Sequence, residues 1–402
     1  MVKKTFFSDE RITMRVAVIN LTGGGISGGY RKYLHKVIPR MAVHPKIESI
    51  LCASPPALNV QNWVGNIPNV KFVTCRPFSF MCHKPEPELR EQVKHFSPDV
   101  LFIPVERYLK FSEMPFVTMI QNMGPLASPV RNIPVSERIK YMAQTIETKI
   151  AVSKADRIIA ISGFVRDFLI NRWKVSSDRI SVVYNGCDLV SDKDKAYERP
   201  TLVLNDWKGK FLFTAGSIEP YRGLEDILYA MKYLQSFELG IDVLVIAGDS
   251  RFNMVSYRDR LKKWLQKNNL STKVCWTGNL NQDEMAWCYQ NCYAFIMTSR
   301  VEACPNIALE SMANGCVCIS ADNPPMPEIF GDSAVYYPPK NAKALAETIQ
   351  TVITWNSDQR NEASERARNR AAEFSWDLTV EKTLAELNKA VHDFRMRGDN
   401  TK

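Results

Sequence analysis

The sequence has few of the features that mark a membrane-spanning protein or a metalloprotein. No apolar run approaches the roughly 18–20 residues that are needed to cross a bilayer. Asp9, Glu10 and Arg11 interrupt the stretch in which a signal peptide would have its apolar core. The ten cysteines are scattered, the five histidines do not cluster, and no CxxC pair stands near a histidine pair. We therefore expect a cytoplasmic protein with reduced thiols, no metal site and no tightly bound cofactor.

The composition is that of a globular protein with two sizeable cores. The chain has 402 residues, of which 45% are hydrophobic and 24% are charged. At roughly 100–200 residues per domain, this length predicts two domains. The formal charge of +9 suits an anionic partner such as a nucleotide or an acidic lipid surface. We do not expect a nucleic acid as a partner.

Short apolar runs alternate with amphipathic segments along most of the chain, which is typical of parallel α/β sheets. The predicted strands are 14–21, 47–53, 70–74, 100–104, 116–121, 157–161, 180–184, 210–215, 242–247, 274–277, 294–297 and 317–320. Helices are predicted at 30–41, 282–290, 306–313 and 376–394, with another starting near 223. The polar stretch 188–209 is interpreted as a linker. It separates a first domain, residues 1–195 together with the C-terminal helix 376–402, from a second domain, residues 196–375.

A glycine-rich turn follows the first predicted strand. Gly23, Gly25 and Gly28 satisfy GxGxxG, and Glu48 lies twenty residues further on, as in a dinucleotide-binding fold. Such a turn is not specific for dinucleotides, because backbone N–H groups at a helix start can bind any phosphate or a sugar. We predict that Gly24 and Gly25 contact a ligand.

Two further turns follow predicted strands of the second domain. After 294–297, Glu302 lies in a loop, Pro305 suits the first position of a helix, and Glu310 lies on that helix, which Gly315 ends. The first N–H groups of the helix can hold hydroxyls or phosphate, and each carboxylate can accept hydrogen bonds from a sugar or a ribose. After 210–215, the segment Gly216–Gly223 places Arg222 at a helix start, an arrangement that suits a diphosphate.

At these residues the sequence resembles glycosyltransferase family 4, the retaining enzymes of the GT-B fold. Several segments match in order, from about residue 14 to residue 394. They are the glycine turn 23–29, Ala155–Ser162 (ADRIIAIS), Val183–Asp188 (VYNGCD), Glu302 and Glu310 with seven residues between them, Leu309–Gly315 (LESMANG) and Pro327–Ile329 (PEI). The resemblance implies an α/β protein with two Rossmann-like domains, whose parallel sheets face each other across a cleft, and a C-terminal helix that crosses back to the first domain.

The resemblance also implies residue roles. Glu302 and Arg222 would be catalytic, Glu302 at the donor sugar and Arg222 at the leaving diphosphate, and Glu310 would bind the nucleotide ribose. The remaining donor contacts would come from Gly24, Gly25, Gly216, Ser217, Asn279, Leu280, Ala303, Cys304, Pro305, Asn306 and Ile307. The donor would be a nucleotide diphosphate sugar, with UDP or GDP expected, and the acceptor a glycan, a lipid-linked sugar or another hydroxyl. The family typically needs no metal, and its leaving diphosphate takes the acceptor proton.

Three positions depart from the family pattern. Ser217 stands where the family usually has an arginine, and Arg222 stands where it usually has a lysine. Arg251 and Arg300 are candidates for the missing cation. Gln121–Gly124 replaces a segment that often carries a histidine, so Asn122 could bind an acceptor hydroxyl but could not act as a base.

The predicted helix 30–41 carries Lys32, Lys36 and Arg40 one turn apart. Such a basic face beside an apolar one could dock on an anionic membrane, which would make the protein peripheral on the cytosolic face, or it could be a solvated face of a core helix. Alternatives to the retaining transferase are a nucleotide-sugar epimerase or inverting transferase of the same fold, a non-catalytic nucleotide-sugar-binding partner subunit, and a nicotinamide oxidoreductase.

Overall fold

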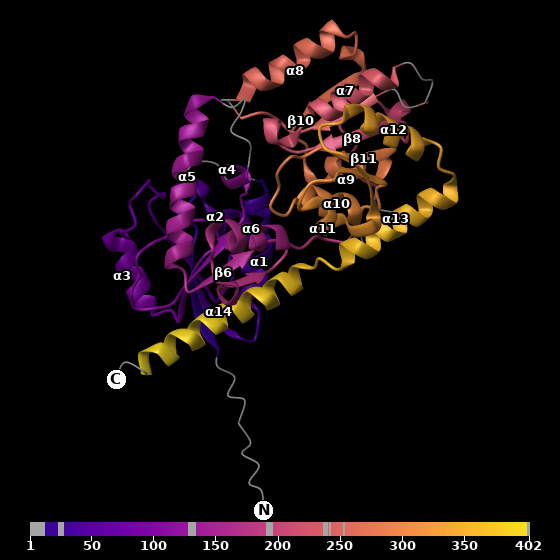
Figure 1. Ribbon diagram of the computed structural model, residues 1–402. Coiled ribbons are helices and arrows are strands. Elements are labelled where there is room, and N and C mark those ends of the chain that lie inside the picture. The colour runs from indigo at the N-terminus through magenta and orange to yellow at the C-terminus, as the bar shows by residue number, and fades with distance from the viewer. Residues whose placement is uncertain are drawn as a thin grey trace, which may run out of the picture.

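A computed structural model describes residues 13–22, 28–127, 134–189, 196–235, 240, 243–251 and 254–399. Two fully parallel sheets lie in two halves of the molecule (Figure 1). The predicted Gly24 and Gly25 and the middle of the predicted linker, 190–195, lie outside the described residues.

The first sheet has seven strands in the order β3-β2-β1-β4-β5-β6-β7. Their bounds are β1 (Met14–Ile19), β2 (Ile47–Ser54), β3 (Val70–Thr74), β4 (Val100–Ile103), β5 (Phe116–Ile120), β6 (Arg157–Ala160) and β7 (Ile180–Val182). The central strands β4 and β5 are buried throughout, because helices cover both faces of a parallel sheet. The helices of this half are α1 (Gly28–Ala42), α2 (Val60–Val64), α3 (Pro87–Phe96), α4 (Gly124–Ala127), α5 (Val135–Lys154) and α6 (Gly163–Trp173).

The second sheet has six strands in the order β10-β9-β8-β11-β12-β13. Their bounds are β8 (Phe211–Ala215), β9 (Val243–Ala247), β10 (Val274–Gly278), β11 (Ala294–Met297), β12 (Cys318–Ala321) and β13 (Ala334–Tyr337). The helices are α7 (Glu225–Leu234), α8 (Val255–Lys267), α9 (Gln282–Asn291), α10 (Asn306–Ala313), α11 (Met326–Phe330), α12 (Ala342–Ile353), α13 (Ser357–Ala372) and α14 (Trp376–Asp399). In both sheets the strand order reverses beside the first strand, and ligands of such sheets bind at the carboxyl ends next to that reversal.

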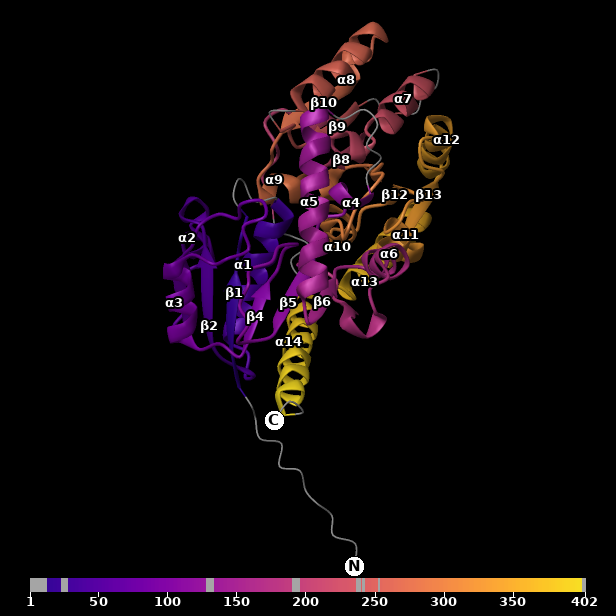
Figure 2. The same cartoon turned by 60° about the vertical axis from the view of Figure 1, so that its left-hand side comes forward.

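The last helix, α14, returns to the first half and packs along its sheet (Figures 1 and 2). Its buried apolar face includes Leu384 and Leu387. Polar contacts also hold it to the first half, among them the ion pair of Arg157 Nε with Glu386 at 2.7 Å and the hydrogen bond between His44 Nε2 and Glu381 at 2.7 Å. The predicted GT-B architecture, with a C-terminal helix crossing back, is confirmed.

The predicted strands coincide with observed ones, with ends that differ by up to two residues. Three predictions agree at both ends: the strands 70–74 and 294–297 and the helix 306–313. Strand β13 was missed because Ala334–Tyr337 is only partly buried at its first three residues and has no long apolar run. The predicted domain division at 195/196 falls between β7 and β8, the last strand of one sheet and the first of the other.

Candidate functional site

The turn after β8 is built so that an arginine side chain folds back over the end of the strand. Gly216 has φ 118°, a conformation that L side chains rarely adopt, and a Cβ there would lie 3.0 Å from the Arg222 guanidinium carbon. Gly223 has φ 62° and lies so close to Thr298 that a Cβ would approach its carbonyl to 2.5 Å. The Thr298 hydroxyl in turn donates to the carbonyl of Arg222 at 2.7 Å. Both glycines are therefore needed to bring Arg222 against the end of β11.

Arg222 and Glu302 form an ion pair at the adjoining ends of β8 and β11. Both side chains are largely buried, with exposed fractions of 17% and 11%. Burial alone would lower the pKa of Arg222, but the negative charge of Glu302 and the contact with Tyr221 outweigh it and raise that pKa, so the guanidinium stays charged. Its Nε–H is buried and has no hydrogen-bond partner among the described residues. A buried cation with an unused donor is suited to bind an anionic oxygen.

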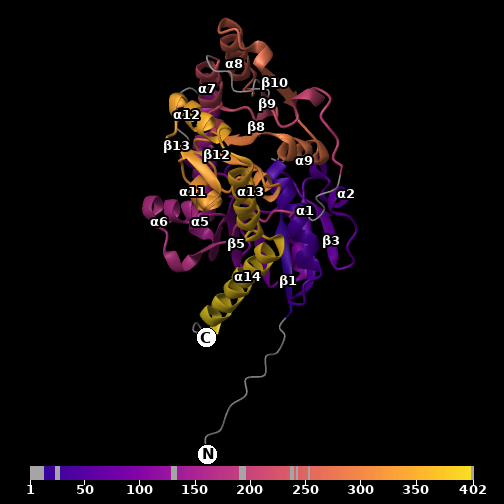
Figure 3. The same ribbon diagram turned by 90° about the vertical axis from the view of Figure 1, so that its right-hand side faces the viewer.

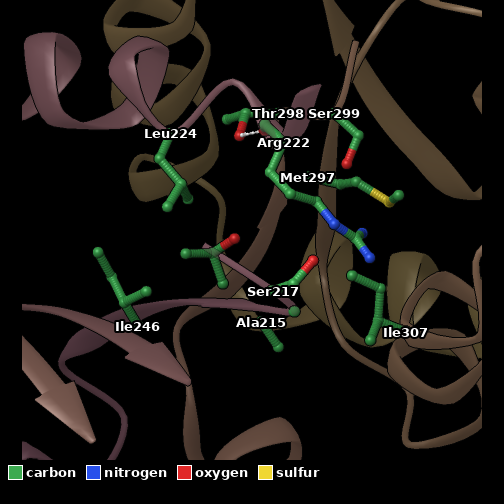
Figure 4. A pocket seen from close by; sticks show the side chains of 11 residues that line it. Ala215, Ser217, Arg222, Leu224, Ile246, Met297, Thr298, Ser299 and Ile307 are labelled. Carbon is green, nitrogen blue, oxygen red and sulfur yellow. Dashed lines mark hydrogen bonds between the residues drawn. The ribbon is translucent and has the colours of Figure 1, made fainter. Parts of the chain in front are cut away.

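The N-terminus of α10 lies beside this pair. A small cavity is lined by Gly216, Ser217, Arg222, Ser299 and Ile307, among others, and Figure 4 shows Ser217 and Ile307 flanking the guanidinium end of Arg222. Ala303, Cys304 and Pro305 are buried in the loop that leads into the helix. Burial raises the pKa of the Cys304 thiol to about 12, so this cysteine is a neutral packing residue. The predicted contacts at Gly216, Ser217, Ala303–Ile307 and Arg222 are thus brought together.

The first half contributes residues directly opposite α10. Asn185 Nδ2 donates to Asn306 Oδ1 at 3.3 Å, and a Cβ at Gly29 would lie 3.1 Å from the Asn306 amide nitrogen. The N-termini of α1 and α10 therefore face each other. The described part of the glycine turn, Gly28 and Gly29, borders the same site.

Glu310 is held from both halves. Lys32 Nζ on α1 lies 2.8 Å from Glu310 Oε1, and the Tyr289 hydroxyl donates to Oε2 at 3.2 Å. Burial lowers the pKa of Lys32, but Glu310 and Asp188 more than offset this and raise it. Each carboxylate oxygen can accept a second hydrogen bond, so Glu310 can still accept from a ribose diol.

The two arginines considered for the missing cation both have acidic partners. Arg251 donates from Nε and Nη2 to the two carboxylate oxygens of the buried Glu219 at 2.5 and 2.6 Å. Arg300 binds both oxygens of the buried Asp226, which also accepts from the Tyr337 hydroxyl at 2.9 Å. Sequence reasoning missed Glu219 and Asp226, because they lie 32 and 74 residues from the arginines that they bind. Of the two, Arg251 is the more exposed, with 48% of its side chain accessible.

On the first half, the loop after β5 is organised by a buried carboxylate that the sequence did not reveal. Glu106 Oε1 accepts from the backbone N–H groups of Gln121 and Asn122, the latter at 2.6 Å. Burial raises the pKa of Glu106, although Arg107 and these N–H groups act against the rise. Asn122 is exposed, and its side-chain oxygen accepts from the Gly124 N–H at 2.9 Å. The binding of an acceptor hydroxyl by Asn122 stays a prediction.

The remaining predicted residues lie at the same edge of the second sheet. Asn279 and Leu280 follow β10, two strands away from β8, and Leu280 packs on the core while Asn279 is exposed. Ser217 Oγ lies 3.0 Å from the Tyr221 hydroxyl. It therefore supplies a hydroxyl, not a charge, where the family usually has an arginine.

Three basic residues of the predicted helix 30–41, Lys32, Lys36 and Arg40, have acidic partners. Lys32 binds Glu310, Lys36 Nζ lies 3.0 Å from Asp188, and Arg40 Nε lies 2.9 Å from Asp377 of α14. These contacts tie α1 to the second half and to α14.

In the part of the chain that the structure describes, no group of three or more His, Cys, Asp or Glu side chains is placed to hold a metal ion. Within the same ranges, no helix is both long and apolar enough to cross a lipid bilayer.

Two parallel Rossmann-like sheets, a buried Arg–Glu pair at the switch point of the second and a returning C-terminal helix define a GT-B protein. The family model described as Glycosyl transferases group 1 matches residues 202–370, and that described as Glycosyltransferase Family 4 matches residues 32–191. The chain belongs to the family 4 glycosyltransferases.

Similar proteins include the O-antigen chain mannosyltransferase RfbU of Salmonella typhimurium, 22% identical over 233 residues, or 57% of this chain and 58% of the relative. A D-inositol 3-phosphate glycosyltransferase of Frankia alni is 24% identical over 69% of both chains. The match thus spans little more than half of the first relative. Anabaena HepE in complex with UDP has the same fold, with a TM-score of 0.70, 16% identity, and coverage of 94% of this chain and 100% of HepE.

Proposed function

We propose that this protein is a retaining glycosyltransferase that moves a sugar from a nucleotide diphosphate to a hydroxyl acceptor. The observation that carries the proposal is the buried Arg222, charged, paired with Glu302 and left with an unused Nε–H beside the N-terminus of α10. A diphosphate oxygen could accept a hydrogen bond from that Nε–H. The negative charge of the diphosphate would also interact favourably with the positive N-terminal end of α10. Glu310 would accept from the ribose hydroxyls.

The proposed reaction breaks the bond between the anomeric carbon and the diphosphate oxygen and forms one to the acceptor oxygen on the same face of the sugar. The leaving diphosphate takes the acceptor proton. Arg222 stabilises the negative charge that develops on the diphosphate, and Glu302 stabilises the positive charge on the sugar ring. Relatives named as mannosyltransferases and a neighbour bound to UDP and glucose support a GDP- or UDP-hexose as donor.

A non-catalytic partner subunit is the second candidate, because Ser217 removes one cation from the diphosphate site. A direct test separates the two. The protein is incubated with UDP- and GDP-hexoses in EDTA, and the initial product of transfer or slow hydrolysis is examined by proton NMR. The proposal expects nucleoside diphosphate release without metal and a product with the donor's anomeric configuration. A product with inverted anomeric configuration would contradict the retaining mechanism, and turnover only with added metal would contradict metal independence. Binding of the donors without turnover of any of them would favour the partner subunit.

We further propose that a peripheral membrane contact, for a lipid-linked acceptor, is made by α5 and not by residues 30–41. Val135, Ile139, Met142 and Ile146 form an exposed apolar stripe along α5, with exposed fractions between 44% and 69%. The charged residues exposed on α5 are basic, and its acidic residues Glu137 and Glu147 are buried. Apolar residues flanked by basic ones suit an anionic lipid surface. Figure 2 shows α5 extending from the first half toward α8.

Flotation with vesicles tests this contact. We expect binding to vesicles that contain anionic lipid, weaker binding to neutral ones, and at least a fivefold loss in Ile139→Ser/Met142→Ser. Lys36→Gln should change binding little. If Lys36→Gln abolished binding and the α5 variant did not, the contact would lie on α1.

A further inference from the structure

A second cavity lies in the second half of the molecule, at the end of α10 opposite the donor site. It has a volume of about 310 Å³ and lies where the C-terminal ends of α9 and α10 meet α13. Helix α10 has eight residues, so about 12 Å of helix separates its two ends. Figure 1 shows α13 alongside α10, with which it packs, and Figure 3 shows α13 next to α14 on the side toward the viewer.

One face of α13 lines the cavity with basic and hydroxyl side chains. Arg360, Ser364 and Arg368 are spaced four residues apart, so they project from the same face of the helix. Asn314 and Asn361 add amide groups to the lining. Among the described residues that line the cavity, none is acidic. The lining therefore carries two positive charges that no carboxylate in the wall neutralises.

Several polar groups of this lining lack partners. Arg360 donates from Nη2 to the Tyr293 carbonyl at 2.7 Å and packs on the Tyr293 ring, but its buried Nη1 has no hydrogen-bond partner among the described residues. The buried Asn314 Oδ1 is also unpartnered in that part of the chain. Arg368 also lines the cavity, next to Gly315. Unpaired buried donors are costly, so the site is incomplete as it stands.

Arg368 can reach the cavity because residue 315 is a glycine and has no side chain. Its φ is 71°, and a Cβ at this position would lie 1.9 Å from an Arg368 guanidinium nitrogen. Any side chain at residue 315 would displace the guanidinium. The turn that ends α10 thus leaves room for a second cation in the cavity wall, about two turns of α13 from Arg360.

We propose that this cavity binds a phosphomonoester of about the size of a sugar phosphate. Guanidinium groups in a wall whose described residues include no acid suit a phosphate, which accepts hydrogen bonds from their N–H donors. Asn314 Oδ1 would accept from a hydroxyl on the body of the ligand. The volume is at the lower end of what small-molecule sites offer. The site is separate from Arg222 and Glu302, and its occupation does not require that the chain transfers a sugar.

Calorimetric titration of the full chain tests the proposal, with glucose 6-phosphate, inorganic phosphate and glucose as probes. We expect saturable binding of glucose 6-phosphate, weaker binding of inorganic phosphate and none of glucose. Arg368→Gln and Arg360→Gln should each weaken glucose 6-phosphate binding at least tenfold. Arg366→Gln is the matched control, because Arg366 lies on the same helix and pairs with Glu362 at 2.6 Å instead. It should leave binding within twofold.

A second control separates this cavity from the donor site. Arg222→Gln should leave glucose 6-phosphate binding within twofold. Binding that is lost in Arg222→Gln and kept in Arg368→Gln would place the phosphate in the donor site and overturn the proposal. Unchanged binding in a folded Arg368→Gln variant, or no binding at millimolar probe, would show that the arginines only stabilise the negative C-terminal end of α10.

Discussion

At the scale of single residues, the proposed mechanism depends on the pair of Arg222 and Glu302. We predict that Glu302→Gln lowers kcat at least about 100-fold, the cost of losing one preorganised electrostatic contact. Nucleoside diphosphate affinity should stay within threefold, because Arg222 keeps its charge. Turnover and calorimetry measure the two quantities, with the exposed Glu347→Gln as control. Full turnover in Glu302→Gln would contradict the assignment.

Glu106 provides a pH-dependent prediction. Its raised pKa means that the folded state holds the proton to a higher pH than the unfolded chain does. Wild-type stability should therefore fall as the pH rises from the ordinary value near 4.5 through the raised pKa, by about 1.4 kcal/mol for each unit of the rise. Glu106→Gln lacks this loss and keeps the oxygen that accepts both N–H groups.

Urea unfolding of wild type, Glu106→Gln and the exposed Glu91→Gln checks this. The stability difference between Glu106→Gln and wild type should grow in favour of the variant as the pH rises, then level off. A difference that stayed flat with pH, or grew in favour of wild type, would contradict the account.

At the scale of elements, α1 and α10 meet through Lys32 and Glu310. Two variants distinguish the role of Glu310 in nucleotide binding from its role in the ion pair between the two helices. Glu310→Ala removes both the ribose acceptor and the ion pair, so we predict that it weakens nucleoside diphosphate binding by roughly 10-fold or more. Lys32→Met removes only the ion pair and should not weaken binding by more than threefold. Equal losses in both variants would mean that the contact between α1 and α10, and not the ribose, accounts for the effect.

The start of α6 gives a second prediction for contact between the two halves. Glu328, just inside α11, accepts from the N–H groups of Gly163 and Phe164, the latter at 2.9 Å, and from the Tyr184 hydroxyl at 2.7 Å. A carboxylate at a helix N-terminus is favourable, and Ala leaves these donors unpaired. Glu328→Ala should lower the free energy of unfolding by about 1–3 kcal/mol in urea titrations. The exposed Glu365→Ala should change it by less than about 0.5 kcal/mol.

At the scale of the whole molecule, the sequence predicts the architecture better than the site. The alternation of short apolar runs is a local signal, and it is enough to place most strands of both sheets. The return of the C-terminal helix to the first half was predicted only from the resemblance to the family. The partners of Arg251, Arg300 and Lys32 come from distant segments, so spacing along the chain cannot reveal Glu219, Asp226 or the contact between Lys32 and Glu310. The pairing of the basic face of helix 30–41 could not be predicted from spacing either, because the acids that pair with Lys36 and Arg40 lie in distant segments.

The central claim is that a nucleoside diphosphate binds at Arg222 without a metal. The direct measurement is thermal unfolding of the wild type and Arg222→Gln in EDTA, against UDP, GDP, ADP, TDP, CMP and NAD. A ligand at a hundred times its dissociation constant adds roughly 2.7 kcal/mol, which is a readily measured shift. The account predicts that one nucleoside diphosphate stabilises the wild type and that Arg222→Gln loses most of that shift. Stabilisation by NAD alone, or an equal shift in both proteins, would contradict it.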